Sequence, residues 1–385
     1  MDGTGLSLIK CFKNVEDPRV DRTKLHTLID IIVMAICAVV AGADSFDAIE
    51  VFATAHEQWF RRFLELPNGV PSQDTFERVF ARISSKEFRA SFAMWTKELA
   101  GIFTNEVIAI DGQTMRGAKR TGQSKSPIHI VSAWAVGLRL VLAQTKVDEK
   151  SNEITAIPEV LKLLEIKGCI VTMDAMGCQQ KIAQQIIDQG GDYVLGLKGN
   201  QGSTLEAIEE HFSTTSESKL PQFQEVDKGH GRIETRTYFG ADACDILDLK
   251  EWPGLKSAIK VVSTREIAGA TSTESRFYIS SIGHSDIKRS GKAVRSHWGV
   301  ENGLHYVLDV TFDQDKSRVR KDHAPENFAV LRHFAMNILK GAPPAKRGST
   351  STNLKRVRAG FDINYLEQIM KGAGLVKSGN SSQSS

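Results

Sequence analysis

The sequence has 385 residues, of which 41% are hydrophobic and 25% charged, and its formal net charge is +3. This composition is ordinary for a soluble globular protein, and the length favours two or three domains over a single core. The five cysteines include no C-x-x-C pair, which argues against a zinc knuckle and indicates a reducing compartment.

The first hundred residues predict helices, because apolar residues recur at three-to-four spacing in three segments. The most apolar run, 28–42, is 15 residues long and contains Asp30. A helix that spans a bilayer needs about 20 apolar residues, so we expect a buried helix and no membrane partner. The opening "MDGTGLSLIKCF" lacks the layout of a signal peptide, so we expect a cytoplasmic protein. The predicted helices are 28–41, 45–66 and 72–99.

From residue 107 the pattern changes to alternating strands and helices. Three consecutive strands are followed by helix, strand, helix, strand and helix, which predicts a mixed sheet covered by helices. This order is that of the ribonuclease-H-like α/β arrangement. The predicted strands are 107–111, 129–136, 138–147, 169–174 and 193–198, and the predicted helices are 156–165, 179–189 and 203–212.

Two of these strands end on a carboxylate, Asp111 and Asp174, each followed by a small residue. In a ribonuclease-H-like sheet the first and fourth strands are neighbours, so the two carboxylates would lie together. Like charges at such short range repel strongly unless a cation lies between them. The alternative is that each aspartate is an ordinary turn former or helix cap.

Residues 213–290 alternate apolar with polar side chains in three segments, 232–241, 256–267 and 274–282, which predicts a β-rich insertion. Helices are expected after it at 292–308, 324–341 and 362–371. The first of these carries the candidate third acid, Glu301. His297 and His305 lie four residues to either side of it, along one stripe of the helix.

A zinc hydrolase is not expected from this stripe. The two histidines are eight residues apart, about 12 Å along a helix, so one ion cannot bind both. Gly299 and Gly303 each cost a helix about 1 kcal/mol relative to alanine. Their presence indicates that something approaches the backbone closely, either the sheet or a ligand.

Basic residues cluster in two segments. Residues 112–147 contain six Lys or Arg and no acid, and residues 316–358 contain eleven against two acids. Such blocks are typical of proteins that bind phosphate-rich partners, and a solvated basic surface is the alternative.

Several motifs occur in a recognisable order: "IAIDGQTMRG", "VTMDAMGCQ…YVLGLKGNQ", "GHGRIETR" and "RSHWGVENGLHYVLDVTFDQD". Together they resemble the DDE transposases of bacterial insertion sequences, in the H-repeat-associated branch. The resemblance runs from about Asp17 to Met370. It implies a ribonuclease-H-like core, an all-α N-terminal domain and a β-rich insertion before a catalytic glutamate. The expected domain bounds are 1–100 (helical), 101–212 (first part of the core), 213–290 (insertion), 291–345 (second part of the core) and 346–385 (basic segment with a disordered tail).

The resemblance further implies that Asp111, Asp174 and Glu301 are catalytic and hold two Mg²⁺ or Mn²⁺ ions. Two such ions, roughly 3.5–4 Å apart, activate a water and stabilise the leaving oxygen in phosphodiester cleavage. A DNA 3′-hydroxyl then replaces water in strand transfer. The expected partner is double-stranded DNA, both element ends and target, with a homodimer formed on it.

Related families carry Tyr-x2-Arg-x3-Glu-x6-Lys around the glutamate. Here Val294, His297 and Leu308 occupy the tyrosine, arginine and lysine positions. The roles of those side chains therefore do not carry over.

DNA contacts are predicted from basic and aromatic residues near the motifs. An ordinary turn around residue 198 and an exposed hairpin of alternating charge at 228–236 are the alternatives for two of the segments. The candidates are Arg116, Lys119, Arg120, Lys198, Asn200, His230, Arg232, Arg295, His297, Trp298, Asn302, His305, Arg318, Arg320 and Lys321.

The leading hypothesis is a metal-dependent DNA transposase that cuts at element ends and joins the 3′-hydroxyl to target DNA. Two alternatives stay open. One is a nuclease on the same core that cuts without joining, and the other is a DNA-binding remnant that has lost catalysis.

Overall fold

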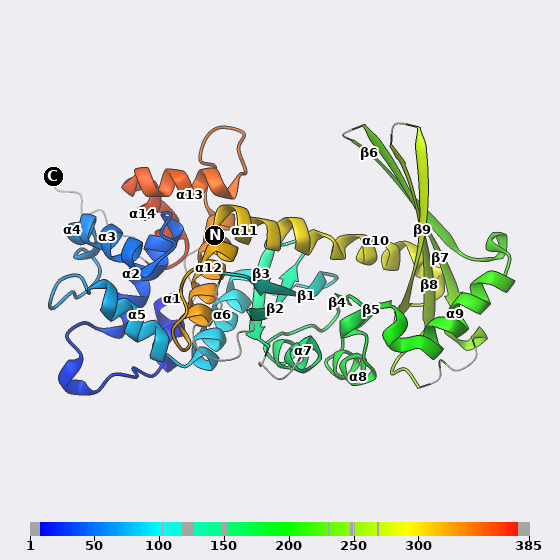
Figure 1. Ribbon diagram of the computed structural model, residues 1–385, viewed down its shortest axis with the longest axis horizontal. Helices are drawn as coiled ribbons and strands as arrows, with labels where there is room; N and C mark the ends of the chain where they lie inside the picture. Colours follow the sequence, from blue (N-terminus) through cyan, green and yellow to red (C-terminus); the bar gives the residue numbers. More distant parts are fainter. Residues whose placement is uncertain are drawn as a thin grey trace, which may run out of the picture.

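The computed structural model describes residues 8–101, 103–117, 127–147, 152–229, 231–246, 249, 251–267 and 269–375. The molecule is elongated, with a helical lobe, a central sheet and a projecting β arm (Figure 1). Three of the predicted DNA-binding residues, Lys119, Arg120 and His230, lie outside the described residues, as does the predicted disordered tail.

The helical lobe is built from both ends of the chain. One hydrophobic core joins residues from Leu8 to Leu375, and the rings of Phe12, Phe88 and Phe334 meet within it. The predicted buried helix is confirmed as α2, which is apolar on all sides and enclosed by the others. The lobe consists of α1 (Leu8–Cys11), α2 (Leu28–Val40), α3 (Phe46–Ala55), α4 (Glu57–Phe60), α5 (Gln73–Arg82), α6 (Ser85–Ala100), α12 (Ala324–Gly341), α13 (Thr352–Phe361) and α14 (Ile363–Gly372).

Among the described helices, none combines the length and the apolar character that crossing a bilayer requires.

The central sheet has the predicted ribonuclease-H-like order, β3-β2-β1-β4-β5. β1 pairs antiparallel with β2 and parallel with β4, so the first and fourth strands are neighbours as expected. Helices α7 and α8 cover one face, while α10 and α11 run along the other (Figure 1). The bounds are β1 (Val107–Met115), β2 (Ile128–Ala135), β3 (Leu140–Lys146), α7 (Glu153–Lys162), β4 (Ile170–Met173), α8 (Gln180–Asp188), β5 (Asp192–Leu197) and α9 (Gly202–Thr214).

The prediction that the first strand ends at Asp111 is wrong. β1 continues through Gly112 to Met115, because these residues stay paired with β2 down to Ile128. A Cβ added at position 112 would collide with the side chains of Glu153 and His129, so glycine leaves room for this pair beside the strand. Asp111 therefore projects from inside a strand, and the alternative of an Asp-Gly turn is excluded.

The insertion extends the same sheet. β9 pairs antiparallel with β5, which makes one nine-stranded sheet, and the outer halves of the added strands form the arm (Figure 1). The three predicted strands are confirmed, and a fourth, β6, was not predicted. Its sequence, "QFQEVDKG", is largely exposed and has little apolar alternation. The strands are β6 (Gln222–Gly229), β7 (Arg232–Asp242), β8 (Ser257–Ile267) and β9 (Ala270–Ser280).

The helix that carries Glu301 crosses the sheet in three consecutive pieces: α10 (Ile287–His297), the π-helical turn η8 (Glu301–His305) and α11 (Tyr306–Thr311). A Cβ at Gly303 would lie 2.9 Å from the buried ring of Trp134 on β2. A Cβ at Gly299 would lie 3.3 Å from Val136. The close approach indicated by these glycines is therefore to the sheet.

Part of the basic segment 316–358 is not available to a phosphate partner. Arg332 is buried over the ring of Phe328, and Lys355 donates to the carbonyl of Leu339 at 2.9 Å. Arg356 donates to the carbonyls of Val39 and Ala43 and pairs with Asp44. Lys355 and Arg356 tie helix ends together and Arg332 is enclosed in the core of the lobe, so only the rest of the segment can contact DNA.

We expect Gly303→Ala to lower the free energy of unfolding by about 1–3 kcal/mol, the usual cost of overpacking a core. The clash with Trp134 outweighs the gain of about 1 kcal/mol in helix propensity. Chemical denaturation measures the change. Gly341→Ala in α12 is the matched control, because no atom lies within 4 Å of its added Cβ. Equal effects of the two substitutions would contradict the packing described here.

Candidate active site

The register of β1 and β4 brings the two aspartates together. Ile110 is paired with Met173, so the next residues, Asp111 and Asp174, follow at equivalent positions on adjacent parallel strands. Such strands are about 4.8 Å apart. The Asp174 carboxylate also accepts a hydrogen bond from the Met176 N–H at 2.9 Å, so it caps a short turn as well.

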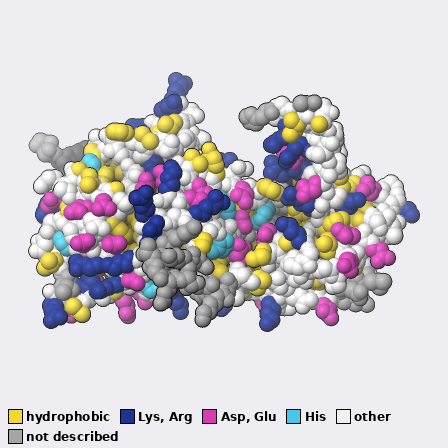
Figure 2. All heavy atoms as spheres, viewed as in Figure 1, with side chains coloured by type: hydrophobic (Ala, Val, Ile, Leu, Met, Phe, Trp, Pro, Cys, Tyr) yellow, Lys and Arg dark blue, Asp and Glu magenta, His cyan; other side chains and the backbone are white. Residues whose placement is uncertain are grey.

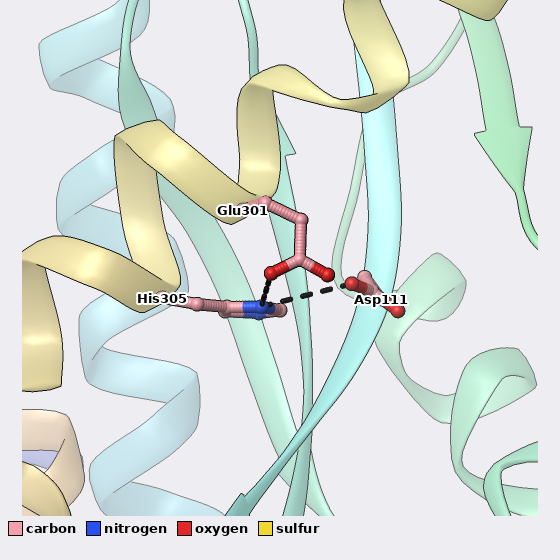
Figure 3. A group of neighbouring side chains, drawn as sticks. All are labelled: Asp111, Glu301 and His305. Carbon is pink, nitrogen blue, oxygen red and sulfur yellow. Dashed lines mark ion pairs between the residues drawn. The ribbon is translucent and has the colours of Figure 1, made fainter.

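The helix above the sheet brings Glu301 and His305 to the same place (Figure 3). The His305 Nδ1 lies 3.7 Å from the Asp111 Oδ2 and 3.6 Å from the Glu301 Oε2. The three ligand atoms of Asp111, Glu301 and His305 all lie within 4.8 Å of one another. Among the described residues, this is the group with the spacing of a metal site, and Asp174 does not belong to it.

Burial and charge make this cluster electrostatically strained in the absence of a cation. Burial is the main cause that raises the pKa of Asp111 to about 7, against a hydrogen bond from the Gly112 N–H. The carboxylates of Glu301, Glu153 and Asp174 raise the pKa further. Burial also lowers the pKa of His305, so its ring is neutral at physiological pH.

A cavity of about 630 Å³ opens onto the cluster. Asp111, Asp174 and Glu301 all line it, although they come from three separate segments of the chain. Three carboxylates and a neutral imidazole are suitable donors for divalent cations, and the desolvated Asp111 among like charges fits such an ion. The other polar lining residues are Lys198, Glu209, Glu274, Ser275, Arg276, Tyr278, His297 and Trp298.

A groove of about 1000 Å³ adjoins this cavity, between the arm and α10. Of the predicted DNA-binding residues, Arg232, Arg295, Trp298 and Asn302 line it, and Glu301 lies on its border with the cavity. Lys and Arg side chains are visible on the arm (Figure 2). Six basic side chains and four carboxylates line the groove: Lys228, Arg232, Arg236, Arg265, Arg276 and Arg295 against Asp227, Glu234, Glu274 and Glu301. The described side chains that line the groove therefore carry a formal net charge of +2.

The other predicted DNA-binding residues divide into exposed and inward-facing groups. Lys198 is exposed at the cavity, and Asn200 donates to the carbonyl of Ala175, which ties its loop to the one after Asp174. Arg116 pairs with Asp315 at 3.7 Å. Arg318, Arg320 and Lys321 are exposed.

The two histidines of the helix stripe turn inward. The His297 Nδ1 lies 3.0 Å from the Thr172 hydroxyl on β4. His305 is only 8% exposed, and its ring lies against the carboxylates, so it offers almost no surface to DNA.

Sequence reasoning missed several residues of the site. Arg265 and Arg276 reach the groove from the neighbouring strands β8 and β9, and their spacing in the sequence gives no sign of this. Arg236, which also lines the groove, lies in the segment 228–236 that the sequence marked as a candidate DNA contact. The His129 ring lies 2.6 Å from Glu153 beside the site, again between distant segments. Only the position of His305 beside Glu301 could be read from the sequence, because an E-x-x-x-H spacing puts both side chains on one helical face.

Comparison with known proteins identifies the family of this chain. The family model described as "DDE_Tnp_1-associated" matches residues 9–96, and the one described as "Transposase DDE domain" matches residues 102–338. The H repeat-associated putative transposase YhhI of Escherichia coli (strain K12) is 40% identical over 361 residues, which cover 91% of this chain and 94% of the relative. The putative transposase YncI of Escherichia coli O157:H7 is 38% identical over 371 residues, 94% of each chain.

Among solved structures, a piggyBac transposase synaptic complex with hairpin DNA covers 94% of this chain and 77% of its own, with a TM-score of 0.41 and 12% identity. That likeness is too distant to bear on the fold or the function. The two family matches and the two relatives, by contrast, extend over most of the chain, and the range matched by the transposase model contains Asp111, Asp174 and Glu301. This chain belongs to the DDE-domain transposases, in their H repeat-associated branch.

Proposed function

We propose that this protein cuts DNA at the ends of an insertion sequence and joins the freed 3′-hydroxyl to target DNA. The observation that carries the proposal is that Asp111, Asp174 and Glu301 line one cavity, which opens beside a basic groove. A reaction on a phosphodiester needs both features, because the acids serve the reacting phosphate and the groove holds the flanking DNA.

Asp111, Asp174 and Glu301 would hold two divalent ions, Mg²⁺ or Mn²⁺. When bound, such ions polarise the phosphate and lower the pKa of the attacking water or hydroxyl. Asp111 would be the residue common to both ions, because it neighbours Asp174 across the sheet and its carboxylate lies within 4.8 Å of that of Glu301.

The other residues of the site position the DNA. Lys198, at the cavity, neutralises charge on the backbone near the reacting phosphate. Arg232 and Arg295 hold flanking phosphates along the groove, which Asn302 also lines. Trp298 is 47% exposed, so its ring offers an aromatic surface on which an unpaired base can stack. The guanidinium of Arg276 lies 5.3 Å from the centre of this ring.

The assembly and the domains follow from the same proposal. Two element ends must be cut and joined together, so we infer a homodimer on the DNA, with each protomer supplying one acid cluster. The expected division into an N-terminal helical domain, a split core and an insertion is kept as part of this proposal. We infer a location in the bacterial cytoplasm, where the DNA substrate lies, and this suits the buried thiols of Cys11, Cys37, Cys169 and Cys178, which form no disulfide.

A strand-transfer assay with DNA that contains the element ends tests the chemistry. Wild type is expected to cleave and join. Asp111→Asn, Asp174→Asn and Glu301→Gln are each expected to lower both rates by at least about 100-fold, the scale of losing one electrostatic partner of the transition state. Asp188→Asn, an exposed aspartate on α8, is the control and should retain both rates.

Cleavage without joining by wild type would instead identify a nuclease. Binding without cleavage would identify a remnant that has lost catalysis.

Ion binding should also appear in the melting temperature. Added Mn²⁺ or Mg²⁺ is expected to raise the melting temperature of wild type, because a ligand of the folded state stabilises it. Asp111→Asn removes a buried charge from among like charges, so this variant should melt higher than wild type in chelator and respond little to added ions. An equal response to ions in both proteins would place the ion site elsewhere.

Salt dependence tests the groove. Arg232→Ala and Arg295→Ala are each expected to reduce the slope of log K against log salt by about one unit, because each removes one phosphate contact. Fluorescence anisotropy with labelled end DNA measures the slope. The control is Lys181→Ala, an exposed cation on α8, on the opposite face of the sheet. Unchanged slopes in the arginine variants would remove the groove from the DNA path.

A further inference from the structure

The ring of His305 lies beside two of the three acids, Asp111 and Glu301, yet the proposed chemistry gives it no role. Its Nδ1 lies between two carboxylates, 3.7 Å from Asp111 and 3.6 Å from Glu301. His305 is only 8% exposed, so the packing of the surrounding side chains fixes the position of its ring. Figure 3 shows the ring side by side with Glu301, both extending from the helix toward Asp111 on β1.

The two distances are informative. Both exceed the 2.7–3.2 Å typical of hydrogen bonds that involve nitrogen. Two ligands of one divalent ion, each about 2.1 Å from it, lie about 3–4 Å apart, depending on the angle at the ion. The spacing around the His305 Nδ1 therefore suits a shared ion better than direct hydrogen bonds.

The helix is locally built to present this ring. Glu301–His305 forms a π-helical turn, and such turns often occur at functional sites. Gly303, inside the turn, packs against Trp134, which lets the helix lie close to the sheet. The neighbouring Leu304 is fully buried in the core below. The direction of the His305 side chain is therefore fixed before any ion arrives.

We propose that the Nδ1 of His305 is a third protein ligand of the divalent ion held by Asp111 and Glu301, and that it makes this position favour a first-row transition ion over Mg²⁺. The inference rests on the proposed function, since it adds a ligand to one of the two ions.

The preference follows from ligand chemistry. Mg²⁺ prefers oxygen ligands and keeps several waters, whereas imidazole nitrogen suits transition ions. A site of two carboxylates and one imidazole should therefore bind Mn²⁺ more tightly than Mg²⁺. The second ion, held by Asp111 and Asp174, has only carboxylates from these residues and should discriminate less.

Electron paramagnetic resonance on the full chain with Mn²⁺ tests the inference in two ways. Free Mn²⁺ is measured during titration, with and without competing Mg²⁺, and pulsed spectra of the bound ion report directly coordinated nitrogen. Wild type is expected to show nitrogen coupling. His305→Gln is expected to lose it and to weaken Mn²⁺ binding by at least about 10-fold, with a smaller loss for Mg²⁺.

His297→Gln is the matched control. His297 lies on the same helix eight residues earlier, with its Nδ1 3.0 Å from the Thr172 hydroxyl, so its loss should leave the nitrogen coupling in place. Wild type prepared with ¹⁵N-histidine should show ¹⁵N in place of ¹⁴N coupling. That measurement needs no substitution, so it holds even if His305→Gln fails to fold.

The possible outcomes distinguish failure of the histidine ligand from failure of the whole ion site. Bound Mn²⁺ that depends on Asp111 but shows no coordinated histidine nitrogen would overturn the inference and leave the carboxylate site intact. Nitrogen coupling that vanishes in His297→Gln would also overturn it. Mn²⁺ binding that is absent, or unaffected by Asp111→Asn, would overturn both this inference and the proposed ion site.

Discussion

The structure depends on bringing like charges together in a partly desolvated place. Asp111 projects from the middle of β1, Asp174 follows β4 at the equivalent position, and Glu301 reaches down from the helix above. Burial and three neighbouring carboxylates raise the pKa of Asp111 to about 7, so the arrangement costs stability without a cation. Because the fold holds these groups rigidly, divalent ions that bind them would stabilise the folded state and also serve the proposed reaction.

Each part of the architecture contributes to that placement. The register of the parallel pair β1 and β4 places Asp111 and Asp174 side by side. The packing of Gly303 against Trp134 sets the distance between the helix and the sheet. The insertion strands continue the sheet beyond β5, so the hydrogen bonds of the sheet fix the position of the arm beside the cavity. The basic groove and the acid cluster therefore have Glu301 on their common border.

Much of this was predictable from periodicity, because buried strands and amphipathic helices carry their pattern in the sequence. The strand order and the adjacency of Asp111 and Asp174 followed from matching the sequence of predicted elements to the ribonuclease-H-like arrangement. The continuation of β1 past Asp111 did not, since Asp-Gly is typical of a turn and only pairing with β2 overrides that preference. The direction of His305 depends on a π-helical turn that 3.6-residue periodicity does not reveal. Arg356 belongs to the basic segment 316–358, and nothing in the sequence indicates its partners, Val39 and Asp44, because they lie some 300 residues away in the chain.

The central claim is that three carboxylates from separate segments share a pair of divalent ions. Anomalous diffraction from crystals of the protein with end DNA and Mn²⁺ measures this directly. We expect two anomalous peaks in the cavity, one between Asp111 and Asp174 and one between Asp111 and Glu301. Peaks elsewhere, or a Glu301 carboxylate that points away from both ions with DNA bound, would contradict it.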